Sequence, residues 1–480
     1  MLLVKFTSKS YYLFVSYAKE YKDCLKYIDG FWDKVTVKPR RRDKLFNFLL
    51  KSAQEKIHRN VLNMPHSFIV PNDKKFTHVF YWDTFFMFRG LIRTKREWLM
   101  KSMVDNFIYL YERHGIIPNF NSPASTGRSQ PPFLTSMILD TYNGPYFTYQ
   151  KINPIRRFLF DLDKYKEWLR EATKTARNEY FHVWMDPHGF FHHTVNGYKL
   201  NRYGDRDVGY AHSSELESGW DFTSRFYNRC NEFLPIDLNV YLFKYERDFA
   251  KIAEHLDMPY EQKYWTDIAL KRKSEINKYM WDKKFGFFFD YGYVYKRQSD
   301  FLSLAGFTPL WAGMASKLQS KKMIKKLSIF ETDYGLTITA KESLAPKINM
   351  SKIPIRYRPA IEDVLKPKQW DYPNSWPPLE YLTVIGLLKY GYIEDAVRIM
   401  KKYLNAHAGI FRKYGTFFEK IDGIRGDKTK DFHYKTQSGF GWTNAIFYRY
   451  VQILDLIESG ENIYVEPKSP NPPYKLSIPH

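Results

Sequence analysis

The sequence predicts an all-α fold, a ring of helical hairpins with short β-hairpins in the connecting loops. Apolar residues recur at helical spacing in segment after segment of the 480-residue chain, and the loops after these segments concentrate Trp, Asp, Asn, Arg and Gln. Hydrophobic residues make up 44% of the chain, which allows a sizeable core. Helix pairs closed into a ring would gather the polar loops at one end and form a pocket there. An open helical array has the same periodicity and stays an alternative.

The first half of the chain shows the helical spacing clearly. Tyr21, Leu25, Ile28 and Trp32 follow one another at steps of four, three and four, which places them on one helix face. His114-Gly115 provides a helix C-terminus. Asn196-Gly197, flanked by β-rich segments, predicts a hairpin within residues 188–203. The helices expected here cover residues 17–33, 45–53, 99–114 and 158–180, and another begins at Phe133.

The second half continues the pattern. Between Leu238 and Leu256 the apolar positions mark a strongly amphipathic helix. An aromatic turn over residues 285–291 and a proline-dotted loop over residues 347–368 separate later helices. The helices expected here cover residues 238–256, 264–281, 312–327, 379–390, 396–404 and 444–457.

The charge of the chain favours no particular partner. Lys and Arg number 74 against 52 Asp and Glu, so the formal net charge is +22, a value that attracts anionic surfaces. The basic residues are nevertheless spread along the sequence, apart from short runs at 38–42 and 321–326. The sequence contains no RNA-binding signature, finger spacing or basic zipper. We therefore expect a solvated basic surface and no specific nucleic-acid partner, and the sequence leaves the oligomeric state open.

Cysteine and histidine usage argues against a metal site. Cys24 and Cys230 are far apart and form no C-x-x-C pair, which makes a disulfide framework or a cysteine-ligated zinc unexpected. His192 and His193 are adjacent, and adjacent side chains on a strand face opposite ways. No apolar run approaches the ~20 residues that a membrane span needs. We expect a cytoplasmic protein, with secretion as the alternative.

One stretch, Glu217-Ser218-Gly219-Trp220-Asp221-Phe222-Thr223-Ser224-Arg225, concentrates the chemistry. Aromatic rings on both sides of Asp221 would strip water from its carboxylate and raise its pKa toward that of a general acid. Alternatively, Asp221 caps a helix beginning at Phe222, with Arg225 as an ion-pair partner. Two similar stretches, residues 369–376 and 437–444, favour the first interpretation, because polar groups beside flat rings are typical of sugar-binding sites.

A sugar hydrolase that inverts configuration needs a second carboxylate to activate water. Asp83, Asp371 and Glu419 all lie near aromatic residues in the sequence, and their spacing does not choose between them. Competing motifs are absent from the sequence: there is no His-Glu-x-x-His, no Gly-x-Ser-x-Gly and no P-loop.

Five segments of the chain resemble the inverting α,α-trehalases, in the same order as in that family. They are Tyr81-Trp82-Asp83, Arg128-Ser129-Gln130-Pro131-Pro132-Phe133, Glu217-Ser218-Gly219-Trp220-Asp221-Phe222, Gln369-Trp370-Asp371-Tyr372-Pro373-Asn374 and Gly439-Phe440-Gly441-Trp442-Thr443-Asn444. The likeness extends from Tyr27 to Ile457. It implies an (α/α)6 toroid, no metal or organic cofactor, and hydrolysis of the disaccharide α,α-trehalose to two glucose molecules. We accordingly expect an N-terminal extension at 1–26, a catalytic domain at 27–460 and a proline-rich tail at 461–480.

The resemblance also assigns roles to single residues. Asp221 matches the general acid, and Glu419 in Phe418-Glu419-Lys420 matches the general base. The positions that match sugar contacts are Trp82, Asp83, Asn119, Arg128, Gln130, Gly219 and Trp370. Lys75 is the candidate where the family has an arginine after two glycines, so that a point-charge ammonium replaces a planar guanidinium.

Two further departures concern the substrate. The family's Arg-Pro-Glu ahead of the acid motif is missing, with Arg206 and Glu215 as possible substitutes. The family's glycine-rich cover loop is replaced by residues 423–434, where the family's Glu falls on His433, and fewer glycines predict a stiffer loop. Two alternatives therefore stay open: an inverting α-glucosidase for another small glucoside, and a sugar-binding protein without catalysis.

Overall fold

The computed structural model describes residues 16–39, 61–151, 162–204, 211–344, 354, 356, 366–431 and 434–460. The helix expected over residues 45–53, the tail at 461–480, Arg206 and His433 lie outside these ranges.

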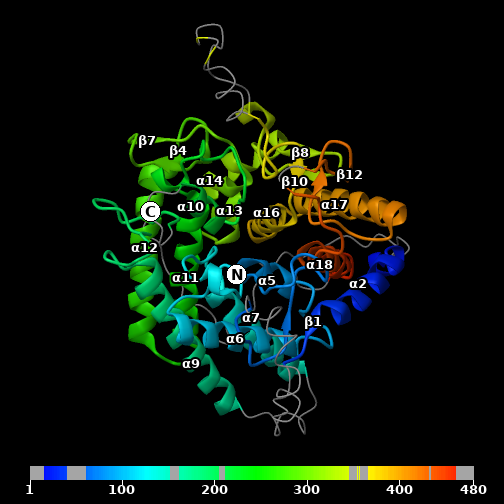
Figure 1. Ribbon diagram of the computed structural model, residues 1–480, viewed down its shortest axis with the longest axis horizontal. Coiled ribbons are helices and arrows are strands. Elements are labelled where there is room, and N and C mark those ends of the chain that lie inside the picture. The colour runs from blue at the N-terminus through cyan, green and yellow to red at the C-terminus, as the bar shows by residue number, and fades with distance from the viewer. Residues whose placement is uncertain are drawn as a thin grey trace, which may run out of the picture.

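An inner ring of six helices closes on itself in the described part of the chain (Figure 1). Each member contacts the next, and the last packs back against the first, so that the C-terminal helix lies beside one from the N-terminal quarter. This closure excludes the open array. In order around the ring the helices are α5 (Tyr81–Phe88), α7 (Leu134–Lys151), α11 (Ile236–His255), α13 (Thr308–Trp311), α16 (Pro377–Lys389) and α18 (Gly441–Glu458).

An outer helix precedes each inner helix along the chain. The six outer helices are α2 (Lys22–Val35), α6 (Trp98–His114), α9 (Leu162–Glu179), α12 (Pro259–Met280), α14 (Lys317–Ile324) and α17 (Ile393–Tyr414). The pairs α6–α7, α9–α11, α12–α11 and α17–α18 are in contact, as hairpins in a double ring should be. The predicted (α/α)6 toroid is confirmed. Two short helices, α1 (Tyr17–Glu20) and α10 (Ala211–Glu217), lie outside this scheme.

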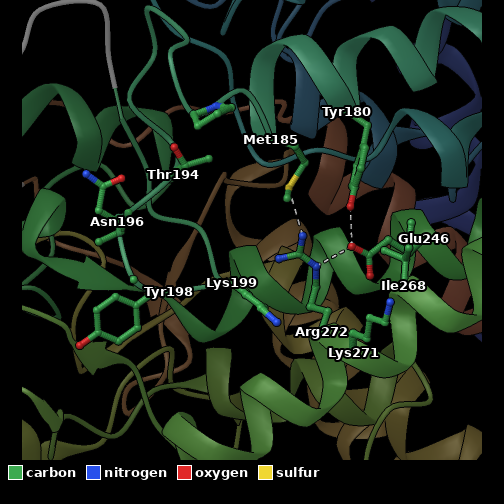
Figure 2. Close-up of a pocket in the computed structure, with 13 residues that line it drawn as sticks. Tyr180, Met185, Thr194, Asn196, Tyr198, Lys199, Glu246, Ile268, Lys271 and Arg272 are labelled. Atoms are coloured by element: carbon green, nitrogen blue, oxygen red, sulfur yellow. Dashed lines mark hydrogen bonds and ion pairs between the residues drawn. The ribbon is translucent and has the colours of Figure 1, made fainter.

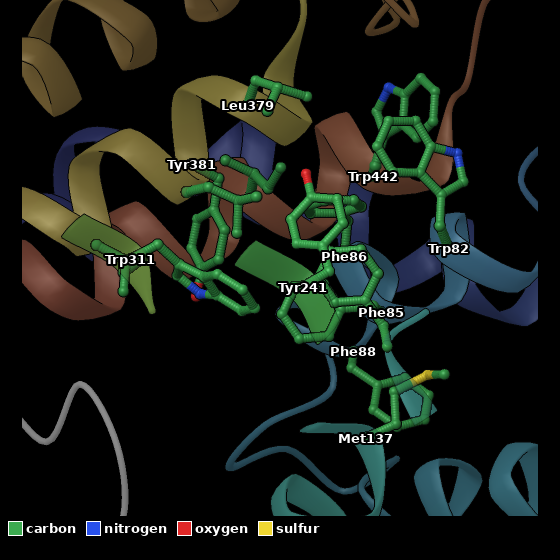
Figure 3. Packing of buried hydrophobic residues seen from close by; sticks show 14 of the residues in the cluster. Trp82, Phe85, Phe86, Phe88, Met137, Tyr241, Trp311, Leu379, Tyr381 and Trp442 are labelled. Atoms are coloured by element: carbon green, nitrogen blue, oxygen red, sulfur yellow. The ribbon is translucent and has the colours of Figure 1, made fainter. Parts of the chain in front are cut away.

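The inner ring is buried on nearly all sides. Every residue of α5 is buried, and all of α16 except Lys389 is buried. Aromatic rings, among them Phe85, Tyr241 and Trp311, fill the centre (Figure 3). Phe85 stacks on Phe133 with 4.3 Å between centroids. Tyr241 and Trp311 pack on Phe133 from two further inner helices, at 4.7 and 5.7 Å. These contacts join four consecutive inner segments around one hydrophobic core.

Local sequence sets the helix ends. Gly115 and Gly415 adopt φ values of +68° and +66°, left-handed conformations that terminate α6 and α17. Ser316 forms a capping box with Gln319, so α14 begins at Lys317 and the earlier start expected at Ala312 is wrong. The helix expected over residues 396–404 instead continues to Tyr414, because no stop precedes Gly415.

Short strands occupy the loops, as predicted. They pair as β1 (Thr36–Val37) with β2 (Phe68–Ile69), β4 (Trp281–Asp282) with β5 (Phe287–Phe288), and β8 (Glu331–Thr332) with β9 (Gly335–Leu336). Two three-stranded sheets contain β3 (Phe233–Leu234), β6 (Tyr291–Gly292) and β7 (Arg297–Gln298), and β10 (Asn374–Ser375), β11 (Ile421–Asp422) and β12 (Asp427–Lys428). The hairpin expected within 188–203 is reduced to one bridge between Thr194 and Asn201. Among the described helices, none combines the length and hydropathy of a membrane span.

Candidate active site

Backbone pairing between loops at one end of the ring positions the candidate residues. A bridge between Phe80 and Phe120 joins the start of α5 to the loop after α6. A second bridge, between Phe418 and Ser438, holds the segment before α18. Strand β11, which follows this bridged segment, pairs with β10 in the loop before α16. Segments more than 300 residues apart in sequence therefore meet at one end of the toroid.

Five tryptophans form a continuous wall at this end. Trp370 stacks face to face on Trp376, with 3.8 Å between centroids and an interplanar angle of 7°. It also contacts Trp220 at 5.5 Å and Trp82 at 5.8 Å. Trp442 completes the wall against Trp82, at 6.3 Å (Figure 3). The tryptophans of the four trehalase-like segments that contain one thus pack together, which their sequence spacing could not show.

Gly219 lies directly against this wall. Its φ of +75° is a left-handed conformation, and a Cβ atom added there would lie 2.6 Å from Cε2 of the Trp82 indole. Glycine is therefore required both by the backbone and by the close approach of the ring. The residue lets the chain pass over Trp82 and present Asp221 two positions later.

Asp221 is partly buried beside the tryptophan wall. Gln369 donates its side-chain amide to the Asp221 carbonyl oxygen at 2.8 Å. Burial first, and then the negative charge of Glu215, raise the pKa of Asp221 to about 7, and the positive charge of Arg128 opposes the change. An acid with this pKa holds a proton at neutral pH and can donate it.

The interpretation of Asp221 as a helix cap is wrong. No helix starts at Phe222, whose φ is +63°, and Arg225 has other partners. The Arg225 guanidinium binds Asp237 at 2.7 Å and Asp290 at 2.7 Å, and all three side chains are buried. Arg225 therefore anchors the loop after Asp221 to the first turn of α11.

Glu419 is 1% exposed and receives three donors. Its Oε1 atom binds the buried ammonium of Lys420 and accepts from the Gln437 backbone N–H at 3.3 Å. Its Oε2 atom accepts from the Tyr434 hydroxyl at 3.2 Å. Burial still raises the pKa of Glu419, while Lys420 and the other donors act in the opposite direction. The carboxylate is held by hydrogen bonds that favour its ionised form.

Asp83 is the third carboxylate of this group. It is 4% exposed, and burial raises its pKa well above the usual range, with added effects from the charges of Asp221 and then Glu419. Glu419 likewise raises the pKa of Asp221. The three acids, from motifs at opposite ends of the sequence, therefore lie close enough to influence one another's ionisation.

Asp371 does not belong to this group. Its carboxylate accepts hydrogen bonds from the hydroxyls of Thr223 and Ser224, at 3.1 and 2.7 Å, and from the backbone N–H of Lys368 at 2.8 Å. These bonds occupy both oxygens inside the protein. Asp371 therefore fastens the loop after Asp221 to the loop before α16, which is a structural role.

The other candidate sugar contacts surround the acids. Asn119 donates its amide to the carbonyls of Ser129 and Leu216, at 3.3 and 3.2 Å, which joins two site loops. Gln130 accepts from the Trp82 backbone N–H at 3.1 Å. Arg128 acts electrostatically on Asp221, as described above, and the Lys75 ammonium lies 4.6 Å from the ring centroid of Tyr434. All ten sequence-predicted site residues thus lie in or beside this loop cluster, and their roles remain predictions.

Four residues of the cluster have no role that the sequence predicts. Lys420, Tyr434 and Gln437 bind Glu419, and Gln369 binds the Asp221 backbone. Glu215, a possible substitute for the missing Arg-Pro-Glu, is buried and accepts from the Thr223 N–H at 3.1 Å. The position of Lys420 directly after Glu419 is the one signal in the sequence that could have indicated these contacts. Within the described residues no group of three His, Cys, Asp or Glu side chains could hold a metal ion.

Comparisons with known proteins agree with this geometry. A family model described as Trehalase matches residues 7–217 and 207–457. Neutral trehalase Nth1 from Saccharomyces cerevisiae is similar in structure, with a TM-score of 0.69 and 24% identity over 92% of this chain and 94% of that one. A GH63 mannosylglycerate hydrolase from Thermus thermophilus, solved with glucose, gives a TM-score of 0.55 and 18% identity over 79% and 95%. The structural likenesses show the shared fold, and the family match shows that this chain belongs to the trehalase family of glycoside hydrolases.

Proposed function

We propose that this protein hydrolyses α,α-trehalose to two glucose molecules with inversion at the anomeric carbon. Asp221 is the general acid and Glu419 the general base. The observation that carries the proposal is the contrast between their surroundings. Asp221 has a pKa of about 7 beside a tryptophan wall, whereas Glu419 is held by a lysine, a tyrosine and a backbone N–H. Such divergent environments are how paired carboxylates acquire acid and base roles.

The acid step requires a proton on Asp221 when the substrate binds. At and below neutral pH a substantial fraction of Asp221 is protonated, because burial penalises its charge. The carboxylic acid then protonates the bridging oxygen as the bond to the departing glucose breaks. The positive charge of Arg128 stabilises the Asp221 carboxylate that is left once the proton has been donated.

The base step requires an ionised, well-oriented Glu419. Lys420 and Tyr434 bind its two different oxygens and so fix the plane of the carboxylate. Glu419 takes a proton from the water that attacks the anomeric carbon on the face opposite the leaving group. Inversion follows from this single displacement.

The surrounding residues suit a sugar. Trp82 and Trp370, buried in the tryptophan wall, give the site an apolar boundary, and Asp83, Arg128 and Lys75 would supply polar groups for hydroxyls. The family's Arg-Pro-Glu is missing and Lys75 replaces a guanidinium. This departure favours a second candidate, an inverting hydrolase of another small α-glucoside.

The test combines substrate choice, anomer and two variants. The parent enzyme, incubated with trehalose, kojibiose and nigerose, should hydrolyse trehalose and release one β-glucose per turnover, detected by NMR before mutarotation. Asp221→Asn and Glu419→Gln should each lower kcat by at least ~100-fold. Turnover of kojibiose or nigerose without trehalose would support the second candidate. Full activity in both variants would mean that the acid and base are wrongly assigned.

The division into an N-terminal extension, a catalytic domain at 27–460 and a tail is part of the same proposal, as is a cytoplasmic location. A secreted form is the alternative for location. The family match from residue 7 to residue 457 supports one catalytic unit over most of the chain.

A further inference from the structure

A pocket lies between α11, α12 and the segment that follows α9 (Figure 2). Its volume is about 430 Å³, within the range of small-molecule sites. It shares no lining residue with the candidate active site. Its apolar lining includes Tyr180, Met185, Val195 and Ile268.

The base of this pocket holds a buried carboxylate with one unused oxygen. Oε1 of Glu246 accepts from the Tyr180 hydroxyl at 2.7 Å and from the Arg272 guanidinium at 2.6 Å. Oε2 is buried and accepts no hydrogen bond from any described residue. An acceptor left unsatisfied at this depth is destabilising, so a ligand that brings a hydroxyl donor gains a hydrogen bond there.

Cations outnumber anions around the same space. Lys199 and Lys271 are exposed and line the rim of the pocket, which Arg272 also lines (Figure 2). Lys199, Lys271 and Arg272 carry three positive charges and Glu246 carries one negative charge, so the net charge of the lining is +2. A phosphate monoester carries a charge of about −1.5 to −2 at pH 7, and so matches this excess.

We propose that the pocket binds a small phosphorylated polyol, such as a hexose monophosphate. The phosphate lies between Lys199 and Lys271 at the rim. A hydroxyl donates to Oε2 of Glu246 at the base, and the carbon skeleton packs on Tyr180, Met185 and Ile268. Inorganic phosphate would bind only the two lysines at the rim, and an unphosphorylated hexose would bind only Glu246 and the apolar residues at the bottom of the pocket.

Isothermal titration calorimetry on the full chain tests this site, with glucose 6-phosphate, inorganic phosphate and glucose as probes. Glucose 6-phosphate should bind at least 10-fold more tightly than either of the others. The variant Lys199→Ala/Lys271→Ala should weaken glucose 6-phosphate at least 10-fold. Both lysines are exposed, so their loss leaves the core untouched. The matched control Lys317→Ala/Lys321→Ala removes the same charge from exposed positions on α14 and should bind as the parent does.

Asp221→Asn should also retain binding, which separates this pocket from the candidate active site. Undetectable binding of glucose 6-phosphate at 10 mM would overturn the proposal. So would equal affinity in the Lys199→Ala/Lys271→Ala variant and in the control. Equal affinities for glucose 6-phosphate and inorganic phosphate would overturn the polyol contact with Glu246.

Discussion

Glu419 and Lys420, neighbours in sequence, form an ion pair in which both side chains are buried, with exposures of 1% and 0%. The Lys420 ammonium also lies 4.8 Å from the ring centroid of Trp376 and 4.7 Å from that of Tyr434. Removal of charges from water in this way is costly unless the geometry of the pair and its further hydrogen bonds compensate for the lost hydration. The arrangement gives Glu419 a fixed orientation and a cation that favours its ionised state.

Lys420→Met should therefore impair the proposed base. Without the cation, the pKa of Glu419 rises further, because Lys420 opposes the effect of burial. The ascending limb of the pH profile of kcat/KM moves to higher pH, and kcat falls by ~100-fold. KM should change little if Lys420 acts through Glu419. The comparison variant is Lys428→Met, which removes a partly exposed lysine near Phe418 and should leave the limb in place. An unmoved limb in Lys420→Met would show that the lysine does not tune the base.

Glu215→Gln should shift the opposite limb. The pKa of Asp221 is raised to about 7, chiefly by burial and next by the negative charge of Glu215. Removal of that charge lowers the pKa, so a smaller fraction of Asp221 is protonated at any pH near neutrality. The descending limb of the pH profile of kcat/KM then moves to lower pH. The ratio of the activity at pH 8 to the activity at pH 5.5 should decrease several-fold, in proportion to the decrease in the protonated fraction of Asp221 at pH 8. Glutamine keeps an acceptor for the Thr223 N–H.

The control for that change is Glu394→Gln, which removes the same charge from an exposed position on α17 that does not act on the pKa of Asp221. Both variants and the parent should be profiled from pH 4.5 to 9. A descending limb that stays in place in Glu215→Gln would argue that Asp221 is not the group that controls it.

The sequence supports the ring of helices and the general nature of the site. Helical spacing after Tyr21 reports a buried face directly, because one face of the outer helix α2 packs on its neighbours. Around Leu238 the spacing marks a helix but not the extent of its burial, because α11 is buried on nearly all sides. The choice between Asp371 and Glu419 could not be made from spacing. It depends on which donors surround each carboxylate, and those donors come from Thr223, Ser224 and Tyr434.

The local sequence pattern gave a wrong prediction where long-range contacts determine the conformation of the loop. Arg225 follows Asp221 at the spacing of a helical partner, yet its guanidinium binds Asp237 and Asp290. The loop takes this course because Gly219 and Phe222 both adopt positive φ values. Glycine favours such a conformation, but phenylalanine does not, so the sequence could not predict it at Phe222. Interactions that span the chain fixed the conformation there.

Gly219→Ala should damage the site more than an ordinary glycine replacement. The left-handed backbone costs about 1–2 kcal/mol for alanine, and the Cβ would overlap the Trp82 indole at 2.6 Å. Displacement of that ring adds about 1–3 kcal/mol of packing strain. Gly415→Ala is the matched control, since its φ is +66° and its Cβ would meet no described atom within 4 Å. Urea denaturation should show the larger loss for Gly219→Ala, together with a lower kcat/KM only in that variant.

Arg225→Met should destabilise the protein by about 3–5 kcal/mol, because it leaves Asp237 and Asp290 buried without a cation. The loop that carries Asp221 loses its anchor to α11, so activity should fall even at temperatures where the protein stays folded. Arg398→Met offers the contrast: Arg398 binds Glu331 with 44% of its side chain exposed, and its loss should cost about 1 kcal/mol or less. Guanidinium denaturation followed by tryptophan fluorescence measures both. Equal losses in the two variants would indicate that the buried arginine contributes no more than a surface ion pair.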